Sequence, residues 1–243
     1  MPLSATTLAT TDPELVAVVD RFAAEDVPRD APLDARPRAL VRLAALVATG
    51  GTAALRVELD DALAAGVTPV ELKELLYQAV PYVGLGRAVD VLVVANELLA
   101  DHEVELPLPG QATVTRATRA TDGLAVQKRI VDADVVDAMY ANAPADEQHV
   151  QRYLSAHCFG DHYTRGGLDV PTRELLTLAM LVALGGADPQ VAGHVRANLN
   201  VGNDRATLLA VLTQLLPVVG YPRTLNALRA LDDVAPPTPE EES

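Results

Sequence analysis

The chain contains an internal duplication, and this feature constrains its fold more than any other. The segment Arg38–Gly51 returns as Arg173–Gly186, with nine of fourteen positions identical. A second block, Gln78–Arg87, recurs as Gln214–Arg223, and the offset between these copies is one residue longer than for the first block. Unrelated segments would share only about one residue in fifteen at ordinary residue usage. The chain therefore contains two homologous units that share one architecture.

The two units differ at one polar position between the repeated blocks. The second unit carries His194 where the first unit carries Glu58. Homologous units with unequal polar side chains suggest one working site and one supporting copy. His194 is therefore the first candidate for a functional side chain, because an imidazole near its ordinary pKa both accepts and donates a proton at neutral pH.

Composition and local signals predict an all-α fold. Almost half of the residues are apolar, mostly Ala, Leu and Val, and only 3% are aromatic; this composition favours helices. Thr68 to Glu71 forms a capping box with Pro69 in the first turn. Pro81 and Pro217 are expected to end the helices that they follow. The helices expected in the repeated units span about 13–24, 38–49, 53–65, 69–80, 86–100, 171–184, 188–200, 205–216 and 221–234.

The same signals divide the chain into four parts. Residues 1–105 form the first unit, and residues 106–122, rich in Pro, Thr, Gly and charges, form a linker. Residues 123–234 form the second unit with its leading helices, which we expect to be two with a break at Ala143-Pro144. Residues 235–243 are expected to form a disordered acidic tail.

Charge and hydropathy exclude several classes of partner. The formal net charge of −14 argues against nucleic acid and anionic membranes, since both require a basic face. The longest apolar segment, 88–100, is interrupted by Asp90 and Glu97, and a bilayer span needs roughly 20 apolar residues. We expect no secretory signal, because the first residues show no basic region followed by an apolar stretch. Cys158 is the single cysteine, which suits a reducing cytoplasm.

Several segments together resemble the carboxymuconolactone decarboxylase family, which shares its helical fold with the alkyl hydroperoxidase AhpD. They are the Gly-Gly helix end, the helix with His194, Asn198–Gly202, Gly220–Ala227 and Cys158–Arg165. The resemblance covers about residues 34–100 and 169–232, and it implies tandem AhpD-like helical bundles. Single-unit members form rings of six, so it also implies a homotrimer with six pseudo-equivalent units.

The resemblance separates two kinds of chemistry. The peroxidase branch depends on a Cys-x-x-Cys pair ahead of the histidine, where this chain has Ala187 and Gln190. Without paired thiols no disulfide can cycle, so thiol peroxidase chemistry is excluded. The decarboxylase branch works without a cofactor and uses polar residues around the histidine. It implies that His194 is the catalytic acid and base and that Glu174 assists it.

Each candidate residue also has a simpler interpretation. Glu174 lies in the first turn of its helix, where the helix dipole alone stabilises a carboxylate. His162 is a third catalytic candidate, since it lies in a segment dense in protonatable groups. Asp161 and Arg165 are alternatively a structural pair that orients this segment. The residues expected to contact substrate are Cys158, Tyr163, Arg165, Arg223 and His157.

The sequence therefore predicts a cofactor-free enzyme that moves a proton next to a carbonyl. The reaction would be a decarboxylation, isomerisation, elimination or cyclisation on a small organic acid, lactone or polyketide-like substrate. The enolate-like state would be stabilised by donors such as Tyr163 or Arg223, in a pocket at a subunit boundary. Two alternatives remain: a non-catalytic oligomer that binds a ligand or serves as a scaffold, and a metal-dependent enzyme using His157, Asp161 and His162.

Overall fold

The computed structural model describes residues 3–237, and these form helices without any strand, which confirms the all-α class. No helix in this range is both long and apolar enough to cross a membrane. Of the expected acidic tail, 235–243, residues 238–243 lie outside the described residues. The first unit comprises η1 (Leu3–Ala5), α1 (Leu8–Thr11), α2 (Pro13–Arg21), the π-helix η2 (Phe22–Asp26), α3 (Val27–Asp30), α4 (Ala35–Thr49), α5 (Thr52–Ala64), α6 (Pro69–Val83) and α7 (Leu85–Asp101). The remaining elements are α8 (Arg119–Val131), α9 (Ala133–Asn142), α10 (Gln148–Tyr153), the π-helix η3 (Leu154–Tyr163), α11 (Val170–Leu184), α12 (Asp188–Asn200), α13 (Arg205–Val219) and α14 (Tyr221–Val234).

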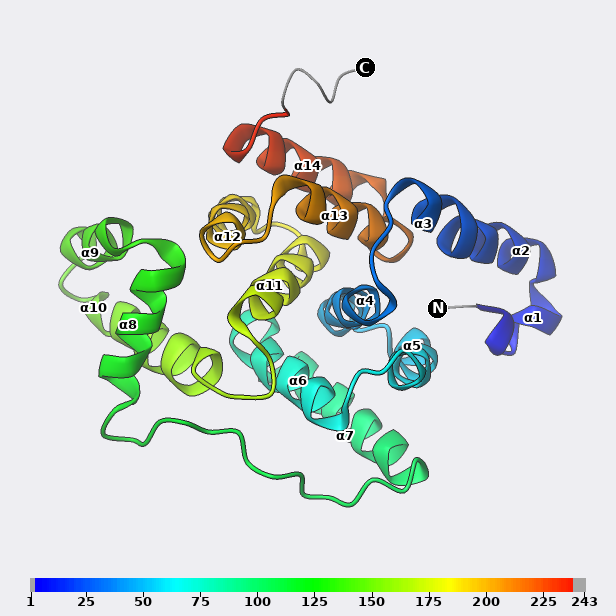
Figure 1. The fold of residues 1–243 in the computed structure, drawn as a ribbon, viewed down its shortest axis with the longest axis horizontal. Coiled ribbons are helices and arrows are strands. Elements are labelled where there is room, and N and C mark those ends of the chain that lie inside the picture. The colour runs from blue at the N-terminus through cyan, green and yellow to red at the C-terminus, as the bar shows by residue number, and fades with distance from the viewer. Residues whose placement is uncertain (1–2, 238–243) are drawn as a thin grey trace.

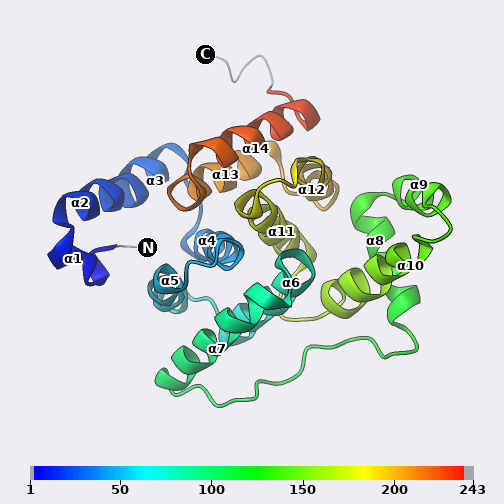
Figure 2. The ribbon, with the colours of Figure 1, turned by 180° about the vertical axis from the view of Figure 1, so that it is seen from behind.

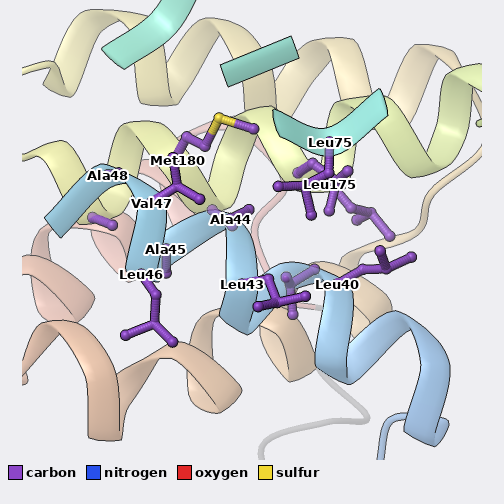
Figure 3. Close-up of a cluster of buried hydrophobic side chains, with 14 of the residues drawn as sticks. Leu40, Leu43, Ala44, Ala45, Leu46, Val47, Ala48, Leu75, Leu175 and Met180 are labelled. Atoms are coloured by element: carbon purple, nitrogen blue, oxygen red, sulfur yellow. The ribbon is translucent and has the colours of Figure 1, made fainter. Parts of the chain in front are cut away.

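The two repeated helices α4 and α11 pack against each other at the centre of the molecule (Figures 1 and 2). Residues 39–48 of α4 and 173–183 of α11 are buried without interruption. A helix that is buried on every side must be covered by other elements on every side, and both helices accordingly lie at the centre of the molecule. Figure 3 shows Leu43 of α4 with Leu75, Leu175 and Met180 in this core.

The two units interleave and do not form separate bodies. Helix α6 of the first unit packs against α11 of the second, and α13 of the second packs against α4 of the first. The amide of Gln78 donates to the carbonyl oxygen of Arg173 at 2.8 Å and to Oγ1 of Thr177 at 2.9 Å. Gln214 correspondingly donates to the carbonyl oxygen of Ala31 at 2.8 Å. The glutamine that recurs in both copies therefore connects one unit to the other.

Pro81 and Pro217 do not end their helices, contrary to the expectation from sequence. Helix α6 continues to Val83 and α13 to Val219. Each proline removes the donor for one carbonyl, four residues earlier in the helix. The helix nevertheless completes its last turn, since the amide of Gly84 donates to Val80 and that of Gly220 donates to Leu216. The chain leaves each helix at the following glycine, Gly84 with φ of 82° and Gly220 with φ of 79°, a backbone conformation that glycine adopts without strain.

Residues 119–163 form a lobe beside the central bundle, with α8, α9 and α10 grouped on one side (Figure 1). It contains three helices where two were expected, because Asp132, with φ of 104°, separates α8 from α9. Helix α8 begins at Arg119, inside the expected linker. It crosses the π-helix η3 closely, since a Cβ added at Gly123 or Gly160 would overlap backbone atoms of the other element. This contact fixes η3, which supplies Cys158 and Tyr163.

Candidate functional site

Glu174 and His194 form a hydrogen-bonded pair between α11 and α12. Oε2 of Glu174 lies 2.8 Å from Nδ1 of His194. The carboxylate is fully buried, whereas 16% of the histidine side chain is exposed. The amide of Asn198 fastens the two helices together, since it donates to the carbonyl oxygens of His194 at 2.7 Å and Glu174 at 3.1 Å. The N-cap of α11 is Asp169, which accepts a hydrogen bond from a backbone amide of the first turn. The Glu174 carboxylate is therefore directed at His194 and is not the helix cap.

A chain of hydroxyl groups leads to the other oxygen of Glu174. The Tyr163 hydroxyl donates to Oε1 of Glu174 at 2.6 Å and lies 2.7 Å from Oγ1 of Thr177. Since Tyr163 has given its only hydroxyl hydrogen to the carboxylate, Thr177 must donate to Tyr163. Gln78 in turn donates to Thr177, and Tyr82 donates to the Tyr163 hydroxyl at 3.2 Å. Each hydrogen bond in this series of hydroxyl groups is thus donated in the direction of Glu174, an arrangement that suits a charged acceptor.

Burial keeps the groups around Glu174 protonated at neutral pH. It raises the pKa of Tyr163 and of Tyr82 well above the ordinary value of 10.0, because the phenolate would lose its hydration. Burial also raises the pKa of the Cys158 thiol to about 12, although a hydrogen bond with Tyr82 acts in the opposite direction. The two tyrosines are therefore hydrogen-bond donors, and Cys158 is a thiol without nucleophilic character.

The second ring nitrogen of His194 is available for chemistry. The carboxylate of Glu174 fixes the proton on Nδ1, so that Nε2 keeps its lone pair. Nε2 has no hydrogen-bond partner among residues 3–237. The ring of Tyr82 meets the imidazole edge to face, with the ring centroids 5.7 Å apart. Glu174 and Tyr82 thus hold the imidazole in one orientation, in which the lone pair of Nε2 is available to accept a proton.

The fold does not bring Arg165 to this cluster. The alternative in which Arg165 pairs with Asp161 is also wrong. Its guanidinium forms a bidentate ion pair with the buried carboxylate of Glu74 at 2.8–3.1 Å. Arg173 joins the same carboxylate at 3.1 Å. Asp161 instead pairs with Arg119 at 2.9 Å. Arg165 therefore fastens the connection before α11 to α6 of the first unit, where two charges share one buried acceptor.

The two histidines of η3 face each other and form no hydrogen bond with His194 or Glu174. Nδ1 of His157 lies 3.0 Å from Asp161, and the rings of His157 and His162 meet with their centroids 5.0 Å apart. Burial lowers the pKa of His162 to about 4, with a further contribution from His157. In residues 3–237, no three His, Cys, Asp or Glu side chains converge well enough to hold a metal ion. The metal-site alternative therefore lacks its ligand set.

Arg223 holds a helix end, as does its counterpart in the first unit. It donates to the carbonyl oxygen of Ala183 in the last turn of α11, and Arg87 donates to the equivalent carbonyl of Ala48. Ala183 follows Glu174 by nine residues, which is about 13 Å along the helix axis. Arg223 thus occupies a repeated architectural position, remote from the Glu174 carboxylate.

Two residues of the cluster did not stand out in the sequence. Tyr82 comes from α6 of the first unit, and Thr177 lies one turn after Glu174 on α11. Both sit at positions where the copies differ, since Val218 replaces Tyr82 and Arg42 replaces Thr177 in the other copy. A comparison of all positions at which the two copies carry different residues would have identified Tyr82 and Thr177 as candidates, together with His194 and Glu58.

The fold and the site define a duplicated helical protein with a buried glutamate–histidine pair and no paired thiols. The family model described as "Carboxymuconolactone decarboxylase family" matches residues 13–97 and 148–233, and the chain belongs to this family. The 4-carboxymuconolactone decarboxylase of Acinetobacter baylyi is 28% identical over 116 residues. That alignment covers 86% of the relative and 48% of this chain.

Proposed function

We propose that the chain is a cofactor-free enzyme of the carboxymuconolactone decarboxylase type, a lyase or isomerase that acts next to a carbonyl. The observation that carries this proposal is the pair formed by Glu174 and His194, which leaves Nε2 of the histidine as an oriented base. Family membership supports the reaction class, and the relative named above is itself a decarboxylase. The substrate class is a small organic acid, lactone or polyketide-like molecule.

In this mechanism His194 moves one proton and Glu174 stabilises the charged imidazole. For an isomerisation, Nε2 removes the proton from the carbon beside the carbonyl, and the electron pair forms an enolate. The imidazolium then returns the proton to another carbon of the conjugated system. For a decarboxylation, Nε2 first takes up a proton from solvent; the bond to the carboxylate then breaks, CO₂ leaves, the electron pair of that bond forms the enolate, and the imidazolium gives its proton to the enolate carbon. The buried carboxylate makes the imidazolium less costly in both cases.

Tyr163 has a positioning role in this proposal, although the sequence suggested direct contact with substrate. Its only hydroxyl hydrogen is given to Glu174 at 2.6 Å. The same hydroxyl accepts from Tyr82 and Thr177, so the carboxylate is held in one orientation. Fixing the carboxylate fixes the imidazole, and orientation of this kind is a large part of general base catalysis.

We also propose that three copies of the chain assemble into a ring, as the family resemblance implies. Helix α7 exposes Leu85 and Val89, which are 62% and 44% accessible. The equivalent positions of α14, Tyr221 and Leu225, are 62% and 56% accessible. The same helix face is thus apolar and uncovered in both units, as expected if each meets a neighbouring copy. Sedimentation should give three times the mass of 25.6 kDa, and a double variant with Leu85→Glu and Leu225→Glu should sediment as a monomer.

Turnover of 4-carboxymuconolactone tests the catalytic proposal. Wild-type protein, His194→Asn and Arg56→Met are compared for CO₂ release and for solvent deuterium incorporated into the product. Arg56 is an exposed arginine paired with Glu97, so its variant controls for an unrelated substitution. We expect His194→Asn to lower kcat/KM by about 10²-fold or more and Arg56→Met to leave it unchanged. Equal turnover by His194→Asn would remove the histidine from the mechanism. Failure of the wild type to react with this lactone or related lactones would favour the non-catalytic alternative.

A further inference from the structure

The first unit contains a cavity of about 460 Å³ between η2, α4 and α5. Its polar lining comprises Arg42 and Glu58, which are buried, with Arg38 and Asp20, which are half-buried, and Asp61 at the rim. The apolar lining consists of small side chains: Ala23, Ala24, Pro28, Ala35, Ala39, Ala64 and Ala65. A cavity with several charged groups and small apolar walls is the usual form of a ligand site.

This cavity lies at the position that the Glu174–His194 cluster occupies in the second unit. The matched regions of the two units begin 135 residues apart, at 13 and 148, which is also the offset between Arg38 and Arg173. The positions that carry large or polar side chains in the second unit carry small ones in the first. Ala23 replaces Cys158, Ala24 replaces Phe159, Pro28 replaces Tyr163, and Ala39 replaces Glu174. The cavity is therefore the space that those four side chains fill in the other copy.

Arg42 is a buried cation in the wall of this cavity. It lies on α4 at the position of Thr177, and only 6% of the residue is exposed. Its guanidinium makes no hydrogen bond or ion pair with any residue between 3 and 237, and its Nε is buried without an acceptor. Arginine cannot shed its proton to escape this situation. A buried guanidinium that forms no hydrogen bond or ion pair is costly, so the site favours a ligand that brings a hydrogen-bond acceptor to Arg42.

The other charges restrict which anion fits. Glu58 is 2% exposed and occupies the position of His194. Asp20 already accepts hydrogen bonds from the backbone amides of Leu3 at 2.6 Å and Ser4 at 2.9 Å. A dianion beside Arg42 would be repelled by the carboxylates of Glu58 and Asp61. A carboxylate oxygen has capacity for more than one hydrogen bond, so these acidic groups can receive a donor from the far end of a ligand.

We propose that the first unit binds a small monocarboxylate that carries an ammonium or hydroxyl group at its other end. The ligand carboxylate pairs with the guanidinium of Arg42 in the bidentate geometry that arginine favours. The donor group faces Glu58 and Asp61. This second site has a different chemistry from the His194 cluster and does not depend on the function proposed for it.

Binding of four probe acids to the full chain tests the proposal. The probes are 4-aminobutyrate, 4-hydroxybutyrate, butyrate and succinate, measured at millimolar concentrations by saturation-transfer NMR and calorimetry. We expect 4-aminobutyrate or 4-hydroxybutyrate to bind about tenfold more tightly than butyrate, which lacks the donor, and succinate to bind weakest. Failure of both donor-bearing acids to bind the wild type, or tighter binding of succinate, would overturn the proposal.

Matched variants locate the site. Arg42→Met removes the charge and keeps the length of the side chain, while Ala39→Leu fills the cavity and keeps the charge. Both should weaken binding of the preferred probe by about tenfold or more. Arg56→Met and His194→Asn should bind it like the wild type. Wild-type affinity in both Arg42→Met and Ala39→Leu, or loss of binding in His194→Asn, would contradict the assignment. Circular dichroism establishes that each variant is folded, and if Arg42→Met does not fold, Ala39→Leu decides.

Discussion

Glu174 holds His194 by a hydrogen bond of 2.8 Å between Oε2 and Nδ1, across the contact between α11 and α12. The same carboxylate receives the Tyr163 hydroxyl on its other oxygen. A buried carboxylate with two donors has one stable orientation, and it passes that orientation to the imidazole. In the proposed mechanism, the orientation of His194 therefore depends on residues that do not themselves contact the substrate.

Removal of one hydroxyl tests this positioning chain. Tyr163→Phe deletes the donor to Glu174 and the acceptor for Thr177, so buried polar groups lose their partners. We predict a loss of about 1–3 kcal/mol in the free energy of unfolding, measured by urea denaturation. Tyr82→Phe should cost less, because the Tyr82 hydroxyl makes only longer contacts of 3.2 Å to Tyr163 and 3.5 Å to Cys158. Equal stability of Tyr163→Phe and the wild type would show that the chain of hydroxyls is not held as described.

Cys158 should be chemically silent in the folded protein. Its pKa is raised to about 12 and its residue is 6% exposed, so almost no thiolate exists at neutral or mildly alkaline pH. We predict that an aromatic disulfide reagent labels the single thiol only when the protein is unfolded in urea. Rapid labelling of the native protein would contradict the buried position of η3.

His162 should make the protein less stable in mild acid. Its pKa is lowered from 6.5 to about 4, so between these values the unfolded chain binds a proton that the folded chain does not. The contribution of the neutral His162 to the unfolding free energy is therefore fully present above about pH 6.5 and is lost as the pH decreases towards 4. His162→Asn should flatten this part of the profile of unfolding free energy against pH. The control is His149→Asn, which should leave the profile unchanged because His149 is an exposed residue of α10. An unchanged slope in His162→Asn would be inconsistent with the burial of this imidazole.

The close contact of α8 with η3 predicts a strong effect at a glycine. A Cβ at Gly160 would overlap the backbone carbonyl of Arg119, so Gly160→Ala should lower the unfolding free energy by about 1–3 kcal/mol. At Gly193, within α12, an added Cβ meets nothing within 4 Å. Gly193→Ala should therefore be neutral or stabilise by up to about 1 kcal/mol, since alanine is the better helix former. If both variants behaved alike in thermal denaturation, the close approach of α8 would be refuted.

Much of the helical architecture could be predicted from sequence. The Gly-Gly pairs predicted the C-terminal ends of α4 and α11 correctly, because a glycine stop acts within one helical turn. The start of α4 at Ala35 was placed three residues too late. The prediction that Pro81 ends its helix was wrong, because α6 continues through this proline to Val83 and ends at the glycine three residues after it. The interleaving of α6 with α11 was not visible, because an apolar helix face shows that it is buried without showing which helix covers it.

The residues of the candidate site were likewise only partly predictable from the sequence. His194 and Glu174 were found because the copies could be compared and because the family resemblance marked them. Arg165 and Arg223 have the chemistry of substrate ligands, but they pair with Glu74 and with a backbone carbonyl, and long-range partners cannot be read from spacing. Tyr82 lies in the other unit, and the signal for it was the unlike pair that it makes with Val218.

In the proposed mechanism Glu174 keeps the proton of His194 on Nδ1 and leaves Nε2 as the base. Long-range ¹⁵N–¹H NMR of the imidazole tests it most directly, at a mildly alkaline pH where a free imidazole is neutral. We predict a single tautomer for His194 in the wild type, with Nδ1 protonated and Nε2 bare, and a mixture of tautomers in Glu174→Gln. A proton on Nε2 in the wild-type protein would contradict the account.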